Sequence, residues 1–181
     1  MPHLCRVETV KAPHPSREWL LETPSQTRQL ANLLGTLLAP GHSIALCGPL
    51  GAGKTLFAKA AAEGMGLPFE LLSSPSFAIA HTYESPRGPL FHADWYRLNS
   101  TDELYMAGIF DHDWPGSISF VEWADKFPSA LPETFLLLRF SPTGGGRKLW
   151  AGAHGGAHEA LLREWTALLK NAPTWGAEKV L

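Results

Sequence analysis

Apolar residues recur along the chain at helical spacing in some segments and as short continuous runs in others. Leucines at positions 30, 33, 34, 37 and 38 repeat every three or four residues, which predicts an amphipathic helix over residues 25–38 with Ser25 as its N-cap. Residues 43–47 form a largely apolar run that ends at a glycine, which is typical of a strand buried on both faces of a parallel sheet. Residues 55–63 are rich in good helix formers and predict the next helix.

The rest of the chain continues to alternate between strand and helix patterns. Short apolar or alternating runs predict further strands at residues 78–83, 90–93, 117–121, 134–140 and 148–151. The last two are joined by a turn that contains three consecutive glycines. Helices are expected over residues 101–110, with Thr101 as the cap, and over residues 158–170. This order of elements indicates an α/β domain.

Length and composition favour one domain with a substantial core. The 181 residues are 45% hydrophobic, which is enough to bury a single core. Pro13, Pro15 and Pro24 interrupt the backbone donors of this first segment, so we assign residues 1–24 to an N-terminal extension with a short strand at residues 4–10. Residues 25–151 form the main domain. Residues 152–181 form a C-terminal helix and tail, which we expect to pack on that domain.

The charge balance argues against direct binding of nucleic acid. The chain has 15 Lys and Arg against 17 Asp and Glu, a formal net charge of −2, and no run of basic residues. Any contact with RNA is therefore expected to be indirect. No apolar run approaches the ~18 residues that span a bilayer, and the two cysteines have neither disulfide-scaffold nor metal-site spacing. We expect a cytoplasmic protein with no membrane partner.

The sequence GPLGAGKT at residues 48–55 fits the phosphate-binding pattern G-x-x-x-x-G-K-T at every fixed position. It lies between a predicted strand and a predicted helix. Glycines there let successive N–H groups face phosphate oxygens, and the helix N-terminus favours the same anion. Lys54 is expected to reach the β- and γ-phosphates, and the Thr55 hydroxyl to bind Mg²⁺. Contacts with the nucleotide are expected from Leu50, Gly51, Ala52, Gly53, Lys54, Thr55 and Leu56.

Two acidic residues that follow predicted strands are candidates for holding the metal ion or orienting a water molecule. They are Asp94, after residues 90–93, and Glu122, after residues 117–121. In folds with a phosphate loop such groups come at the carboxyl ends of strands, so either could serve the Mg²⁺ site. Together with Lys54 they are the expected catalytic residues. The predicted fold class is α/β, a P-loop NTPase-like sheet that is mostly parallel with antiparallel additions and is flanked by helices.

Five motifs follow one another along the chain. They are GPLGAGKT at residues 48–55, SPSF at residues 74–77, HADWYRL at residues 92–98, EL and GI within residues 103–109, and VEW at residues 121–123. In order and spacing they resemble the TsaE family, the bacterial P-loop ATPases of tRNA threonylcarbamoyladenosine biosynthesis. The resemblance extends over residues 23–140.

The resemblance implies a Mg²⁺-dependent ATPase with ATP as its nucleotide. It also implies two partners, TsaB and TsaD, which form the heterodimer that transfers the threonylcarbamoyl group to adenosine 37 of tRNA. By the same resemblance, Lys54 and Thr55 carry the phosphate and metal roles. Asp94 matches the acid of an H-x-D motif, and Glu122 matches a Walker-B-like acid.

Three further residues have expected roles, two of which, those of Ser76 and Trp123, come from the resemblance. Ser76 stands where the family has a switch-like threonine, and it keeps the hydroxyl but lacks the methyl group that stiffens the rotamer. His92 and Trp123 lie beside the two acids in the sequence. We expect them to support those acids or to contact a partner protein.

Two other functions are compatible with a phosphate loop. Small-metabolite kinases share the size and the loop, but they close a lid with several arginines over the phosphates. This chain has eight arginines and no such cluster. A nucleotide-gated binding module would hold its partners when loaded with ATP, without a hydrolytic cycle.

Overall fold

The strand predicted at residues 43–47 is β2 (Ser43–Cys47), which is buried along its whole length. In the computed structural model, which describes residues 15–171, β2 is the middle strand of a seven-stranded sheet with the order β1-β7-β6-β2-β5-β4-β3. The other strands are β1 (Ser16–Leu21), β3 (Ala80–Ser85), β4 (Gly88–Asp94), β5 (Ile118–Glu122), β6 (Phe135–Thr143) and β7 (Gly146–His154).

Four central strands, β6, β2, β5 and β4, pair in parallel, and β3, β7 and β1 add to the edges in antiparallel pairs. Because β1 is antiparallel to β7, it points the same way as the central four strands. Five strands of the sheet therefore share one direction, and the predicted fold class is confirmed.

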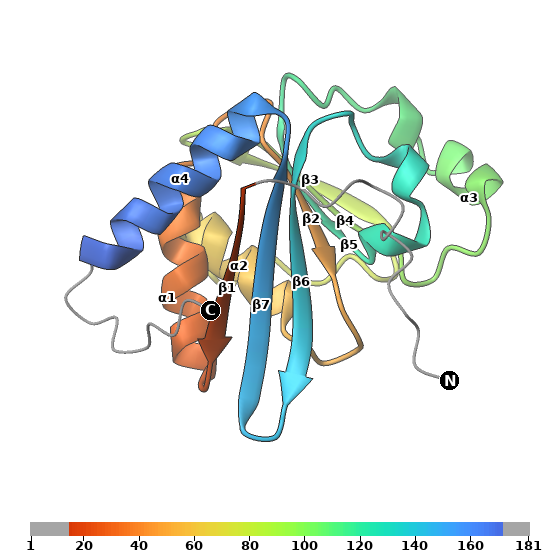
Figure 1. Ribbon diagram of the computed structural model, residues 1–181. Coiled ribbons are helices and arrows are strands. Elements are labelled where there is room, and N and C mark those ends of the chain that lie inside the picture. The colour runs from red at the N-terminus through yellow and green to blue at the C-terminus, as the bar shows by residue number, and fades with distance from the viewer. Residues whose placement is uncertain (1–14, 172–181) are drawn as a thin grey trace.

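Helices cover both faces of the sheet (Figure 1). The helices α1 (Pro24–Gly35), α2 (Lys54–Gly64) and α4 (Gly156–Asn171) share one face, where the ring of Trp165 lies 4.8 Å from that of Trp19 and 6.1 Å from that of Phe57. On the other face lie α3 (Thr101–Met106) and the 3₁₀ helices η2 (Ile109–Asp111), η3 (Ala124–Lys126) and η4 (Pro128–Ala130). No helix within residues 15–171 is both long enough and apolar enough to span a bilayer.

The N-terminal part of the fold differs from the prediction. Strand β1 lies inside the segment assigned to an extension, and it pairs with β7 at the edge of the sheet. Its inward-facing side chains, Trp19 and Leu21, are buried in the core, while the prolines lie outside the strand and remove none of its hydrogen bonds. The strand predicted at residues 4–10 lies outside the described residues.

Two predicted helices have different boundaries in the structure. Helix α1 starts at Pro24 with Thr23 as its N-cap, so the assignment of Ser25 as the cap is wrong. Helix α3 ends at Met106 and is capped by Ser100 instead of Thr101. The helix predicted to reach residue 110 stops early because Gly108 takes a positive φ of 71°, after which the chain continues as η2.

The C-terminal hairpin is longer than the sequence predicts. Strand β7 covers nine residues, where the pattern indicates only residues 148–151, and it pairs with β6 from Phe135 opposite His154 to Thr143 opposite Gly146. Helix α4 follows and packs against β7 and α1. The tip of this hairpin consequently lies at the end of the sheet where β2 leads into α2 (Figure 1).

Candidate functional site

The phosphate loop, residues 48–55, leads from the carboxyl end of β2 into the first turn of α2. Gly51 and Gly53 have φ values of 76° and 103°, which residues with a Cβ rarely adopt. The tight path of the loop therefore depends on glycine at these positions. The ammonium group of Lys54 folds back over the loop and donates hydrogen bonds to the carbonyls of Gly48 at 2.8 Å and Pro49 at 3.0 Å. Carbonyl groups of the loop thus hold the Lys54 ammonium in place.

Lys54 is almost fully buried although it carries a charge. Its Nζ lies 3.9 Å from the centre of the Trp123 ring, a cation–π contact. Trp123 has a φ of 58°, uncommon for a residue other than glycine, as the chain turns out of β5. Burial lowers the pKa of the Lys54 ammonium, and the nearby carboxylates of Glu122 and Asp94 oppose that shift.

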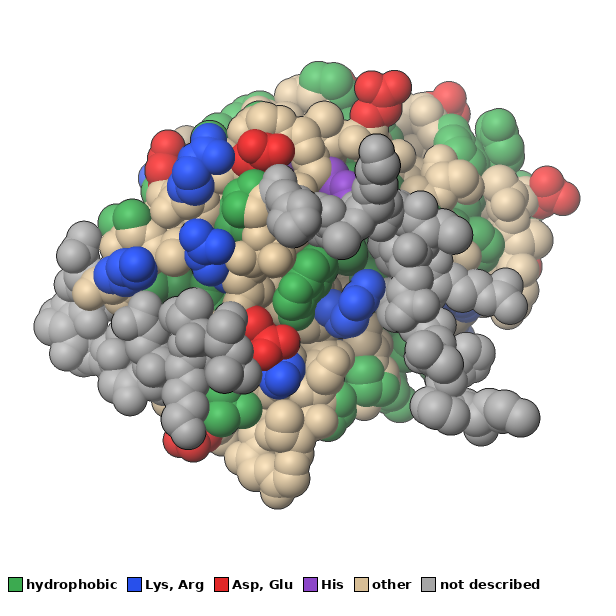
Figure 2. Space-filling view, viewed as in Figure 1, with side chains coloured by type: hydrophobic (Ala, Val, Ile, Leu, Met, Phe, Trp, Pro, Cys, Tyr) green, Lys and Arg blue, Asp and Glu red, His purple; other side chains and the backbone are tan. Residues whose placement is uncertain are grey.

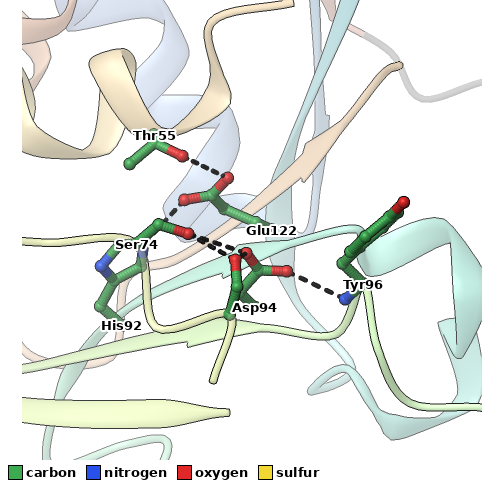
Figure 3. Close-up of polar contacts among 7 residues, drawn as sticks. Thr55, Ser74, His92, Asp94, Tyr96 and Glu122 are labelled. Atoms are coloured by element: carbon green, nitrogen blue, oxygen red, sulfur yellow. Dashed lines mark hydrogen bonds and ion pairs between the residues drawn. The ribbon is translucent and has the colours of Figure 1, made fainter. Parts of the chain in front are cut away.

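Glu122 is the last residue of β5 and lies opposite Leu46 of β2 in the sheet register. Its Oε2 accepts a hydrogen bond of 2.9 Å from the Thr55 hydroxyl, and its Oε1 lies 3.0 Å from Nε2 of the fully buried His92 (Figure 3). A carboxylate oxygen only accepts, so Nε2 of His92 carries the proton in this contact. Glu122 is therefore fixed on one side by the phosphate loop and on the other by β4.

Asp94 is the last residue of β4 and pairs with Glu122 in register, so the two acids lie side by side at the carboxyl ends of neighbouring strands. Its Oδ2 accepts hydrogen bonds from the hydroxyls of Ser74 at 3.1 Å and Ser76 at 2.5 Å. Its Oδ1 accepts the backbone N–H of Tyr96 at 2.9 Å (Figure 3). Asp94 therefore anchors the loop that carries Ser76, whereas Glu122 contacts the phosphate loop.

A cavity of about 220 Å³ opens between these groups. Its lining includes the predicted residues Leu50, Gly51, Gly53, Lys54, Thr55, Leu56, Ser76, Asp94, Glu122 and Trp123. Two predicted residues are not part of the lining. Ala52 belongs to the loop but its side chain is buried in the core, and His92 lies behind Glu122.

The sequence left three residues of this region without a role. Ser74 and Tyr96 stand inside motifs that carry the family resemblance, but spacing alone does not indicate that both hydrogen-bond Asp94. Arg147, in the C-terminal hairpin, donates a hydrogen bond of 3.1 Å from Nη1 to the carbonyl of Ala52. Nothing in the sequence could have indicated it, because the two residues are 95 positions apart and Arg147 belongs to no motif.

The chemistry of the cavity suits a phosphate group and a hard metal ion. Thr55, Asp94 and Glu122 present hydroxyl and carboxylate oxygens, which are the ligand atoms that Mg²⁺ prefers. Lys54 and the start of α2 supply positive charge to the same cavity. The residues present therefore fit a nucleotide with its Mg²⁺.

Comparison with known proteins shows which family the chain belongs to. The family model for the threonylcarbamoyl adenosine biosynthesis protein TsaE matches residues 21–149. The chain belongs to the TsaE family. The resemblance drawn from the five motifs is thereby confirmed, and it places the chain among proteins of tRNA threonylcarbamoyladenosine biosynthesis.

Individual members of the family cover most of the chain. The TsaE protein of Bacillus subtilis is 33% identical over 148 residues, which cover 81% of this chain and 92% of that protein. The TsaE protein of Synechocystis is 36% identical over 119 residues, covering 62% of this chain and 73% of that protein. Among solved structures, that of Bacillus subtilis YdiB superposes with a TM-score of 0.66 at 31% identity, covering 84% of this chain and 95% of YdiB.

Proposed function

We propose that this chain is a Mg²⁺-dependent ATPase of tRNA threonylcarbamoyladenosine biosynthesis, whose cycle of ATP binding and hydrolysis acts on the TsaB–TsaD pair. The observation that carries the proposal is the 2.9 Å contact between the Thr55 hydroxyl at the start of α2 and the Glu122 carboxylate at the end of β5. P-loop NTPases hold Mg²⁺ between a hydroxyl of the phosphate loop and a strand-end carboxylate. Membership of the TsaE family supports the assignment to the pathway.

Each group of the cavity has a part in binding the nucleotide. The N–H groups of the phosphate loop and the Lys54 ammonium would neutralise the phosphates, with Lys54 exchanging its carbonyl partners Gly48 and Pro49 for phosphate oxygens. Thr55 and Glu122 would hold the metal ion. When bound, Mg²⁺ would supply charge neutralisation at the β- and γ-phosphates.

Asp94 takes a different part from Glu122 in this proposal. Both of its oxygens are hydrogen-bonded, and through Oδ2 it holds the Ser76 hydroxyl at the cavity wall. In this proposal the Ser76 hydroxyl would contact the γ-phosphate, as switch residues of nucleotide-dependent proteins do. Each carboxylate oxygen accepts more than one hydrogen bond, so Asp94 can also orient the attacking water.

The charge distribution supports indirect contact with tRNA, through protein partners. On the face drawn in Figure 2, Lys and Arg side chains of the described residues are interspersed with Asp and Glu. The whole chain carries a formal charge of −2. A protein that binds tRNA on its own usually gathers basic side chains to neutralise phosphates.

The test is phosphate release from Mg-ATP with and without the TsaB–TsaD pair from the same source. We expect turnover that the pair stimulates, and a loss of at least about 100-fold in Lys54→Ala because the variant lacks the cation at the phosphates. Lys59→Ala is the matched control. Lys59 lies on the same helix, but its ammonium packs 4.7 Å from the centre of the Phe69 ring instead of lining the cavity.

The outcomes separate the possible functions. Turnover lost in Lys54→Ala and kept in Lys59→Ala supports the ATPase. Nucleotide binding without any turnover, even with TsaB–TsaD present, contradicts the hydrolytic cycle and leaves a gated binding module. Transfer of phosphate to an added metabolite would contradict the proposed ATPase function and indicate a kinase.

A further inference from the structure

Arg147 is the second residue of β7, and its guanidinium lies directly against the phosphate loop. Its Nη1 donates a hydrogen bond of 3.1 Å to the carbonyl of Ala52. A Cβ added at Gly53 would come within 2.0 Å of the same nitrogen, so the side chain occupies the space that glycine leaves open. The contact is therefore made with the loop backbone itself.

We propose that Arg147 is a positioning residue that holds the peptide between Ala52 and Gly53 in the orientation that binds phosphate, an inference that rests on the proposed nucleotide-binding function. The carbonyl of Ala52 and the N–H of Gly53 belong to one planar trans peptide and point in opposite directions. Fixing the carbonyl on the Arg147 side fixes the N–H on the other side. An N–H in this part of a phosphate loop is a phosphate donor.

The loop needs such an anchor because of the glycines that shape it. Gly51 and Gly53 both have positive φ values, and glycine gives the backbone on either side of Ala52 wide freedom to rotate. A hydrogen bond from a charged donor is stronger than one between neutral groups. Arg147 therefore restricts the loop before nucleotide binds. The loop then loses less conformational entropy on binding, which raises the affinity for nucleotide.

The anchor is itself held by the sheet. Arg147 lies in register with Leu21 of β1 on one side and with Pro142 of β6 on the other, so its backbone is fixed between two strands. A side chain on a paired strand positions a loop more firmly than one on another loop. The strand β1 and the long hairpin, both underestimated from the sequence, thereby gain a role at the phosphate loop.

Arg147 is not among the residues that line the cavity, and it contacts the loop from outside. A residue in that place acts on binding through the loop, without touching the transferred phosphate. We therefore expect Arg147→Met to weaken the affinities for ADP and for ATP by the same factor, about tenfold. The kcat at saturating ATP should change by less than about threefold, because the γ-phosphate contacts remain.

The experiment measures the Kd of Mg-ADP and Mg-ATP by calorimetry and kcat by phosphate release, for the full chain and its variants. Lys148→Met is the matched control, because Lys148 is the next residue of β7 and pairs with Glu18 instead of the loop. Hydrogen exchange without nucleotide adds a second readout. Amides of residues 48–56 should exchange faster in Arg147→Met, while those of β2 and β5 stay protected.

A second variant keeps the test valid if Arg147→Met does not fold. Arg147→Gln retains a polar end but is too short to reach the Ala52 carbonyl, and it should weaken both affinities in the same way. Unchanged affinities in a folded Arg147 variant would overturn the inference. A loss of kcat with unchanged ADP affinity would also overturn it, because that pattern marks a group acting on the γ-phosphate.

The inference and the proposed function fail in different ways. If the wild-type protein binds neither ADP nor ATP, the proposed function is rejected and this inference with it. If the wild type and Lys148→Met bind nucleotide and the Arg147 variants bind it equally well, this inference alone is rejected.

Discussion

A buried carboxylate such as Glu122 must have its charge compensated by hydrogen bonds. Glu122 is 2% exposed, and it is held by the Thr55 hydroxyl and by Nε2 of the fully buried His92. Each oxygen thus has one partner, and the direction of the carboxylate is set by two different elements. If Glu122 is a metal ligand, His92 determines where that ligand points.

Replacing His92 tests this positioning. We expect His92→Leu to lower kcat for ATP hydrolysis about tenfold, because Oε1 of Glu122 loses its donor and the carboxylate can turn away from the metal position. His92→Gln offers an amide N–H near the place of Nε2 and should recover most of the activity. Equal activity in all three proteins, measured with saturating Mg-ATP, would show that His92 does not position Glu122.

At the scale of single residues, the sequence indicated which side chains carry the chemistry better than it indicated which side chains contact one another. The phosphate loop and the two acids could be predicted because each stands in a fixed pattern or directly after a strand. Spacing could not separate the roles of Asp94 and Glu122, since both come at strand ends. That distinction depends on which loop contacts each acid, and the tertiary fold determines those contacts.

At the scale of elements, the start of α1 shows how two candidate caps compete. The sequence offers Thr23 and Ser25, both of which can cap a helix. Thr23 is the cap because its hydroxyl accepts the N–H of Gln26 at 3.2 Å, while Oε1 of Gln26 accepts the N–H of Thr23 at 3.0 Å. This reciprocal pair, with Pro24 at the first helical position, outweighs a lone serine.

The competing caps give a direct prediction. Thr23→Ala should lower the free energy of unfolding by about 1 kcal/mol, because the N–H of Gln26 loses its acceptor. Ser25→Ala should change it by less than about 0.5 kcal/mol, since Ser25 is exposed and is not the cap. Urea unfolding at constant m-value measures both. A larger loss from Ser25→Ala than from Thr23→Ala would contradict the assignment.

The edge strands were harder to predict than the central ones. Strand β2 is apolar throughout and buried on both faces, so its pattern is strong. Strand β1 has only two fully buried side chains and lies between prolines, which weakens its pattern. Its stability comes from pairing with β7 and from packing of Trp19 on Trp165, contacts that link distant parts of the chain.

At the scale of the whole molecule, His158 joins the C-terminal helix to the central strand. It is fully buried in the first part of α4, and its Nε2 accepts the backbone N–H of Ser43 in β2 at 3.0 Å. Nε2 must be unprotonated to accept this bond. Burial, with the nearby His42 and His154 adding to it, lowers the pKa of His158 to about 4. Burial also lowers the pKa of His42 and of His154.

This histidine makes stability depend on pH in a defined window. In the unfolded chain His158 binds a proton below about pH 6.5, whereas in the folded protein it stays neutral until about pH 4. The unfolded state therefore gains protons first, and the contribution of His158 to stability falls as the pH drops from 6.5 towards 4. Between pH 7 and pH 4.5 we expect a loss of about 2 kcal/mol from this group.

His158→Gln separates this contribution from those of His42, His154 and the carboxylates, which titrate in both proteins. Glutamine keeps an oxygen that can accept the N–H of Ser43 but takes up no proton. Urea unfolding at pH 7 and at pH 4.5 should therefore show a smaller loss of stability on acidification in the variant than in the wild type, by about 2 kcal/mol. Parallel losses in the two proteins would mean that His158 is protonated in the folded state without cost, and that α4 is not held to β2 by a neutral histidine.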